Sequence, residues 1–188
     1  MANWYSEAVR HPGILNDILF RIVFGSQSNE PVLRALLNAL LGLQDQDRIV
    51  ELILLNPFLE KDFFSDKGPI LDLKAKDAAG RQYNVEVQRH PGPDSYVRRS
   101  FYYGSRFYTE QLQQGESYNK LQKTVCLSIL DFVLFSDSPN LHHIFELRER
   151  DHHFLLDDLL ELHFLELTKF RADKPITCRL PSSAGSTF

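Results

Sequence analysis

Two segments of alternating apolar and polar residues, joined by a short turn, constrain the fold of this chain more than any other feature. Residues 70–77 and 82–88 both show this alternation, and Ala78, Ala79 and Gly80 lie between them. Alternation with a period of two is typical of β-strands that bury one face. Glycine in so short a connection is typical of a hairpin turn, because glycine readily adopts left-handed backbone conformations. The sequence therefore predicts a β-hairpin.

The two faces of this hairpin determine its register. The apolar face carries Leu71, Leu73, Ala75, Tyr83, Val85 and Val87, and the polar face carries Asp72, Lys74, Lys76, Gln82, Asn84, Glu86 and Gln88. Both apolar sets must lie on the same side of the sheet, because a slip of one residue moves every side chain to the opposite face. A loop of three or five residues meets this requirement, whereas a loop of two or four does not. Asp72 then lies directly opposite Glu86, and Lys74 lies opposite Asn84.

Two carboxylates on the polar face are therefore expected to face each other. Such cross-strand pairs have Cβ atoms roughly 4.5–5.5 Å apart, and like charges at this distance are destabilising. A divalent cation between Asp72 and Glu86 would remove the repulsion, and Mg²⁺ prefers oxygen ligands of this kind. A charged hairpin face in solvent would also place an Asp opposite a Glu by chance, so the hairpin alone makes the pair only a candidate metal site.

The rest of the chain adds helices and further strands around the hairpin. Helical spacing of apolar residues predicts helices, and short β-branched apolar runs predict strands. The predicted helices cover residues 14–24, 29–42 and 95–114, and the predicted strands cover residues 49–55, 125–135, 144–147 and 160–167. This order describes a single α/β domain over residues 1–171 with a mixed sheet, followed by a polar, flexible tail over residues 172–188.

Charge and composition limit the partners and the compartment. The net charge is −4, whereas nucleic-acid-binding domains usually carry a basic excess, so any DNA-binding surface must be a local patch. The N-terminus lacks the apolar core of a signal peptide, and no apolar run reaches the roughly 18 residues of a membrane span. Cys126 and Cys178 form no metal-binding spacing and indicate no oxidising compartment. We therefore expect a cytoplasmic protein that has no membrane partner.

Four motifs occur in order along the chain. They are FRIVFG at residues 20–25, LLNALL at 36–41, LDLKAKD and VEVQ within 71–88, and an arginine- and tyrosine-rich pattern from Arg99 to Tyr118. Their combination resembles the recombination-promoting nuclease/putative transposase family of PD-(D/E)XK nucleases. The resemblance implies a restriction-endonuclease-like αβββαβ core, in which helices flank a mixed central sheet and additional C-terminal strands follow.

The resemblance also implies the chemistry of the hairpin. In PD-(D/E)XK nucleases the Asp and the Glu ligate the metal, and the residue two positions after the Glu orients the attacking water. Asp72, Glu86 and Gln88 are then the catalytic residues of this chain. Asp72 and Glu86, with the Val87 carbonyl, bind Mg²⁺, for which Mn²⁺ or another divalent cation can substitute. The implied protein is a metal-dependent DNA endonuclease associated with DNA recombination or transposon-like mobile elements.

The chain departs from the general PD-(D/E)XK pattern at the position of the catalytic lysine, which Gln88 occupies. Glutamine can orient a water by hydrogen bonding but supplies no positive charge to the transition state. The family that the chain resembles commonly carries glutamine there, so the change does not imply an inactive enzyme, although it is compatible with a slow one. Relatives usually continue beyond the segment ending near Phe170 into a charged C-terminal region, which we expect to be missing here.

The predicted helix over residues 95–114 supplies candidate DNA contacts. Arg99, Tyr103 and Arg106 share one face by their i, i+4 and i+7 spacing, and Arg98 lies beside them. In a nuclease these side chains are candidates for phosphate binding. Alternatively, the aromatic residues pack the helix onto the sheet while the arginines are only solvated. Asp17, on the first predicted helix, is a candidate further acidic ligand or an ordinary solvated position.

Other functions are open at this level. The pairs His142-His143 and His152-His153 suggest zinc only weakly, because adjacent residues on a strand face opposite ways and no cysteine lies near. One rival interpretation is a catalytically weak or inactive remnant of a nuclease that binds DNA or oligomerises. Another is a protein-binding α/β module. DNA is the expected partner, and a second copy of the chain is a further candidate.

Overall fold

The computed structural model describes residues 17–56, 72–91 and 95–170. The helices are α2 (Asp17–Phe24), α3 (Glu30–Leu40) and α4 (Tyr96–Thr109), and short 3₁₀ turns are η1 (Gln27–Asn29), η2 (Asp45–Asp47), η4 (Tyr118–Lys120) and η5 (Leu167–Lys169). The strands are β1 (Leu52–Leu54), β2 (Leu73–Asp77), β3 (Gln82–Gln88), β4 (Thr124–Leu130), β5 (His142–Phe145) and β6 (Leu160–Glu166). The first residues of the first predicted helix and the predicted tail over residues 172–188 lie outside the described residues.

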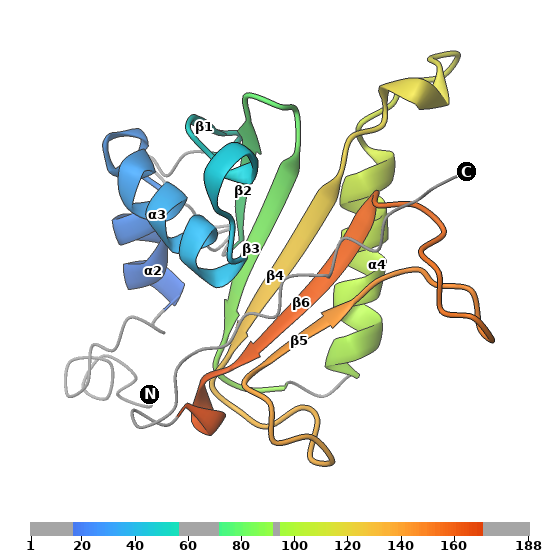
Figure 1. Ribbon diagram of the computed structural model, residues 1–188. Coiled ribbons are helices and arrows are strands. Elements are labelled where there is room, and N and C mark those ends of the chain that lie inside the picture. Colours follow the sequence, from blue (N-terminus) through green and yellow to red (C-terminus); the bar gives the residue numbers. More distant parts are fainter. Residues whose placement is uncertain (1–16, 57–71, 92–94, 171–188) are drawn as a thin grey trace, which may run out of the picture.

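Within the described residues, six strands form one mixed sheet in the order β1-β2-β3-β4-β6-β5. The strands β1, β2 and β3 are antiparallel, β3, β4 and β6 are parallel, and β5 is antiparallel to β6. Helices α2 and α3 cover one face of the sheet and α4 covers the other (Figure 1). This arrangement confirms the predicted αβββαβ core with a mixed central sheet, flanking helices and additional C-terminal strands.

The β2–β3 hairpin has the register that its alternating faces predict. Lys74 pairs with Asn84 and Lys76 with Gln82, as expected for a three-residue loop. Gly80 has a φ of 90°, in the left-handed region that such loops require of one residue. The register of the hairpin therefore follows from sequence parity and turn chemistry together.

The core lies on both sides of the central strands. Leu33 and Leu37 of α3 pack with buried residues of the hairpin on one face, and Tyr96 of α4 packs with Leu130 and Phe164 on the other. Every residue of β4 is buried, because helices cover both of its faces. Among the described residues, no helix is both long and apolar enough to span a bilayer.

The strand predicted over residues 125–135 is wrong at its end, since β4 stops at Leu130. The chain leaves the sheet because the backbone N–H groups of Leu134 and Phe135 donate to the carboxylate of Glu166, which is fully buried. Lys169 neutralises this carboxylate, with its Nζ 2.6 Å from Glu166 Oε2. A buried charge pair therefore replaces the sheet hydrogen bonds that a longer strand would make.

Candidate active site

Asp72 and Glu86 lie together at one end of the hairpin, on the face that α4 covers. Leu73 pairs with Val85, and one step further the same register sets Asp72, immediately before β2, opposite Glu86 in β3. Burial raises the pKa of Glu86, and the charge of Asp72 raises it further, whereas Arg99 and Tyr96 act in the opposite direction. The carboxylate of Glu86 is therefore only partly compensated by its neighbours.

Arg99 of α4 connects two of the predicted site residues. Its Nη2 donates to Glu86 Oε1 at 2.9 Å and to Gln88 Oε1 at 2.7 Å. The guanidinium lies over the Tyr96 ring, 4.8 Å from its centroid, and the Tyr96 hydroxyl donates to Glu86 Oε2 at 3.3 Å. The first turns of α4 thus hold the side chains of β3 in place. The sequence placed Arg99 on one helix face with Tyr103 and Arg106, as a candidate phosphate contact, and it gave no signal for these contacts with the strand.

The backbone of Asp72 is held by two residues that the sequence analysis did not single out. Arg21 Nη1 and Asn56 Nδ2 donate to the Asp72 carbonyl at 2.7 and 3.0 Å. Asn56 Oδ1 also accepts from the backbone N–H of Lys74 at 2.7 Å. Arg21 is only 5% exposed, so its guanidinium is committed to this internal position. The position of Arg21 between Phe20 and Ile22, in a helix made mostly of apolar residues, was the available signal.

Gly25 allows α2 to approach β2 closely enough for this contact. A Cβ atom at Gly25 would lie 2.5 Å from the Arg21 carbonyl oxygen and 2.8 Å from Leu73 Cδ2. Both distances are shorter than van der Waals contact, so a larger residue would push the end of α2 away from the hairpin. The glycine after the helix therefore serves close packing as well as helix termination.

The other two candidate ligands are the Val87 carbonyl and Asp17. The Val87 side chain is buried on the opposite face of β3, so only its carbonyl is a candidate ligand. Asp17 begins α2, one turn before Arg21, but its side chain lies outside the described residues. Two carboxylates and a carbonyl form an all-oxygen donor set of the kind that Mg²⁺ or Mn²⁺ takes. This set and the incomplete compensation of Glu86 fit a divalent cation.

The other candidate DNA contacts lie on the surface of α4. Arg98 is exposed, Tyr103 is 52% exposed, and the Arg106 side chain is 61% exposed. Arg106 Nε pairs with Glu110 at 2.8 Å, and Lys74 of β2 approaches the same carboxylate at 3.6 Å. The alternative that the aromatic residues only pack against the sheet does not hold for Tyr103. Among the predicted phosphate contacts, which all lie in the described part of the chain, Arg99 is the one that is hydrogen-bonded to Glu86.

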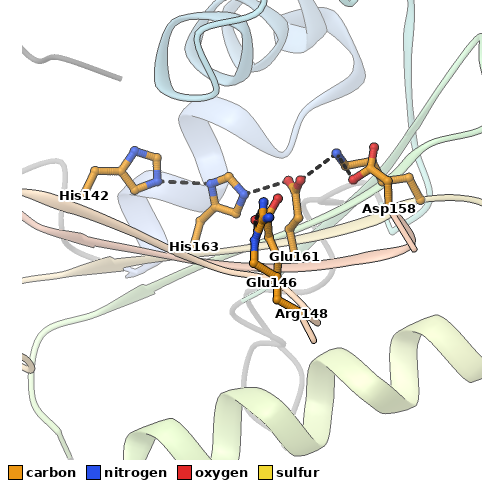
Figure 2. A network of polar contacts seen from close by, with 7 residues as sticks. His142, Glu146, Arg148, Asp158, Glu161 and His163 are labelled. Atoms are coloured by element: carbon orange, nitrogen blue, oxygen red, sulfur yellow. Dashed lines mark hydrogen bonds and ion pairs between the residues drawn. The ribbon is translucent and has the colours of Figure 1, made fainter. Parts of the chain in front are cut away.

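A second polar cluster lies on the opposite face of the sheet, where Figure 2 shows its side chains in a line. His142 Nε2 is 3.1 Å from His163 Nδ1, and His163 Nε2 is 3.0 Å from Glu161 Oε2. Lys123 Nζ donates to Glu161 Oε1 and to Asp158 Oδ1, both at 2.7 Å. The groups bond in sequence along the strand and do not converge on a common point.

The protonation of this cluster follows from its donors and acceptors. Glu161 can only accept when ionised, so His163 Nε2 donates to it, whereas the direction of the bond between His142 and His163 depends on their tautomers. Burial works to raise the pKa of Glu161, but the hydrogen bonds from His163 and Lys123 outweigh it and lower the pKa to about 2. Burial lowers the pKa of His142 to about 4. This cluster is internally satisfied.

The histidine pairs form no zinc site in the described chain. His143 faces away from His142, with its ring 4.8 Å from that of Phe135, as expected for neighbours on a strand. His152 is exposed and pairs with Glu149 at 3.3 Å. Across residues 17–56, 72–91 and 95–170, no group of three or more His, Cys, Asp or Glu residues is arranged to hold a metal. A cation between Asp72 and Glu86 would therefore keep several waters, as Mg²⁺ commonly does.

Comparison with known proteins identifies one family. A family model described as PD-(D/E)XK nuclease family transposase matches residues 14–178. The match includes the hairpin, α4 and all of the described strands. No curated protein and no solved structure matches the chain at a significant level.

Proposed function

Because the chain belongs to the PD-(D/E)XK nuclease family transposases, we propose that it is a metal-dependent DNA endonuclease that serves DNA recombination or a transposon-like mobile element. The observation that carries the proposal is the opposition of Asp72 and Glu86 across the hairpin, with the pKa of Glu86 raised by burial and by the Asp72 charge. Two carboxylates held this close favour the binding of a cation.

The role of each site residue follows from the atoms that it can offer to a metal ion or to a water molecule. Asp72, Glu86 and the Val87 carbonyl would hold Mg²⁺, or Mn²⁺ in its place. A divalent cation in such a site lowers the pKa of water and stabilises negative charge on the leaving oxygen of a phosphodiester. Gln88 would orient the attacking water through its amide. Asp17 is a further candidate ligand, since it lies one turn from the residue that holds the Asp72 carbonyl.

DNA would approach over the exposed side of α4. Arg98, Tyr103 and Arg106 would contact phosphates, the part of DNA that supplies most non-specific affinity, whereas Arg99 is hydrogen-bonded to Glu86 and Gln88. Because the net charge is −4, this patch has to act locally against an acidic protein. DNA affinity should therefore fall steeply with salt.

Plasmid nicking tests the proposal. Purified protein should convert supercoiled plasmid to the nicked form with Mg²⁺ or Mn²⁺, and EDTA should abolish the reaction. Asp72→Asn should abolish it as well, because a neutral amide replaces a ligand. Asp151→Asn, which changes an exposed aspartate in a surface turn, is the matched control and should nick like wild type. Nicking that survives Asp72→Asn would refute the proposed site.

A second function is favoured by one observation. Gln88 supplies no positive charge to a transition state, and a protein that binds DNA without cleaving it does not need that charge. Such a remnant would bind plasmid at low salt and show no metal-dependent nicking at any protein concentration. The same nicking assay therefore separates the two functions.

A further inference from the structure

Arg99 places a positive charge beside Gln88, whose own side chain is neutral. Its Nη2 lies 2.7 Å from Gln88 Oε1 and 2.9 Å from Glu86 Oε1. The guanidinium therefore lies at the tip of side chain 88, close to the place that the ammonium group of a lysine at this position would reach. A positive charge is present there, although it comes from another element of the fold.

The guanidinium is held more firmly than the other arginines of α4. It lies over the Tyr96 ring, and its side chain is 34% exposed, compared with 61% for Arg106. A cation that is less exposed to solvent is screened less and acts more strongly on nearby charge. Arg99 is thus oriented toward β3, whereas Arg106 pairs with Glu110 of its own helix at the surface.

The amide of Gln88 is fixed at both ends. Arg99 has only donors, so it identifies the amide atom that faces it as Oε1. Gln88 Nε2 donates to the His90 carbonyl at 2.7 Å. Within the described residues, these bonds use one of the two N–H groups and one of the oxygen lone pairs of the amide. One N–H group and one lone pair of the Gln88 amide therefore remain for other partners.

We propose that Arg99 is a positioning residue of the nuclease site, which orients Gln88 and Glu86 and supplies the positive charge that the glutamine lacks. This inference rests on the proposed nuclease function. In this chain, the task of one lysine is divided between two elements. Gln88 on β3 acts on the water, and Arg99 on α4 holds Gln88 and provides the charge.

A cycle of variants at positions 88 and 99 tests this division. Arg99→Ala should lower the single-turnover rate of plasmid nicking at saturating Mn²⁺ by about 10- to 100-fold, the usual effect of losing a residue that supports a metal site. Gln88→Lys in the Arg99→Ala background should recover the rate to within about tenfold of wild type, because the charge returns. In the presence of Arg99, Gln88→Lys should give no gain, since it places two cations side by side. Arg99→Lys should retain part of the activity.

Two measurements without turnover separate this role from others. Mn²⁺ affinity, from calorimetry, should be at least as high in Arg99→Ala as in wild type, because a cation that competes for Glu86 is removed. The salt dependence of DNA binding in EDTA should not change, because the proposed role does not involve phosphate. Arg150→Ala removes an exposed arginine of a surface turn and is the matched control for both. Thermal unfolding shows whether each variant is folded.

The outcomes are distinct. Recovery by the double variant with Mn²⁺ affinity retained supports the proposal. A folded double variant that is no faster than Arg99→Ala overturns it, and so does a loss of Mn²⁺ affinity parallel to the loss of rate. A lower salt slope with normal turnover would identify Arg99 as a phosphate contact and also overturns it. Wild-type protein that never nicks removes the proposed function and this inference together, whereas an unchanged rate in Arg99→Ala removes only the inference.

Discussion

Glu86 and Glu161 lie on two strands of the same sheet, and their pKa values are shifted in opposite directions. Each is accompanied by a basic side chain, Arg99 or Lys123, and by a ring that bonds its second oxygen. The side chain of Glu161 is 11% exposed and that of Glu86 is 25% exposed. Burial acts to raise the pKa of both carboxylates, yet the pKa of Glu161 is lowered to about 2 and that of Glu86 is raised.

The difference comes from the partners. Glu161 receives Lys123 on one oxygen and His163 on the other. Glu86 shares its arginine with Gln88 and faces the charge of Asp72. A saturated carboxylate stabilises the fold and has little to offer a ligand, whereas an under-compensated one gains from a cation. This difference supports a structural role for Glu161 and agrees with the metal-binding role that we propose for Glu86.

The largest effect should come from neutralising each glutamate in turn. Glu86→Gln should lower metal-dependent nicking by at least about 1000-fold, because the charge that holds the metal is lost. Glu161→Gln should nick within about tenfold of wild type when both proteins are folded, since effects far from the site are indirect. Plasmid conversion at saturating Mn²⁺ measures both rates. Equal losses in the two variants would erase the distinction between the clusters.

Stability should respond in the opposite way. Glu161→Ala leaves Lys123 and His163 without their buried acceptor and should lower the free energy of unfolding by about 3–5 kcal/mol. Glu86→Ala should cost less than about 1 kcal/mol in EDTA, because it also removes the repulsion from Asp72 and leaves Arg99 partly hydrated. Urea denaturation followed by circular dichroism measures both. A larger loss for Glu86→Ala would mean that Glu86 belongs to the structural framework.

The histidine end of the Glu161 cluster should make folding sensitive to acid. The pKa of His142 is lowered by burial from 6.5 to about 4, so the folded state favours the neutral ring. Its contribution to stability is fully present above pH 6.5 and is lost as the pH falls toward 4, by up to about 3 kcal/mol. His142→Asn should flatten the free energy of unfolding across this window. An unchanged pH dependence would contradict the neutral assignment.

Local rules predicted the hairpin but not what surrounds it. Parity and loop length placed Asp72 opposite Glu86, because register depends on neighbouring residues and turn chemistry. The contact between Arg99 and Gln88 depends on how α4 packs on β3, and the bond from Arg21 to Asp72 spans 51 residues. Such contacts have no spacing pattern in the sequence.

The same limit applies to the strands beyond the hairpin. The segment around Glu161 and His163 was expected only as a strand, although both side chains are buried and paired. A single sequence shows that these polar residues interrupt an apolar strand, but it cannot show which distant side chains satisfy them. The buried Glu166, which ends β4 early, was missed for the same reason.

The location of a bound metal tests the central claim most directly. Crystals grown with Mn²⁺ allow its position to be found from anomalous scattering. The account predicts one strong peak coordinated by the carboxylates of Asp72 and Glu86, with no peak at Glu161 or His163. A peak at the histidine cluster, or none between Asp72 and Glu86 at saturating Mn²⁺, would contradict it.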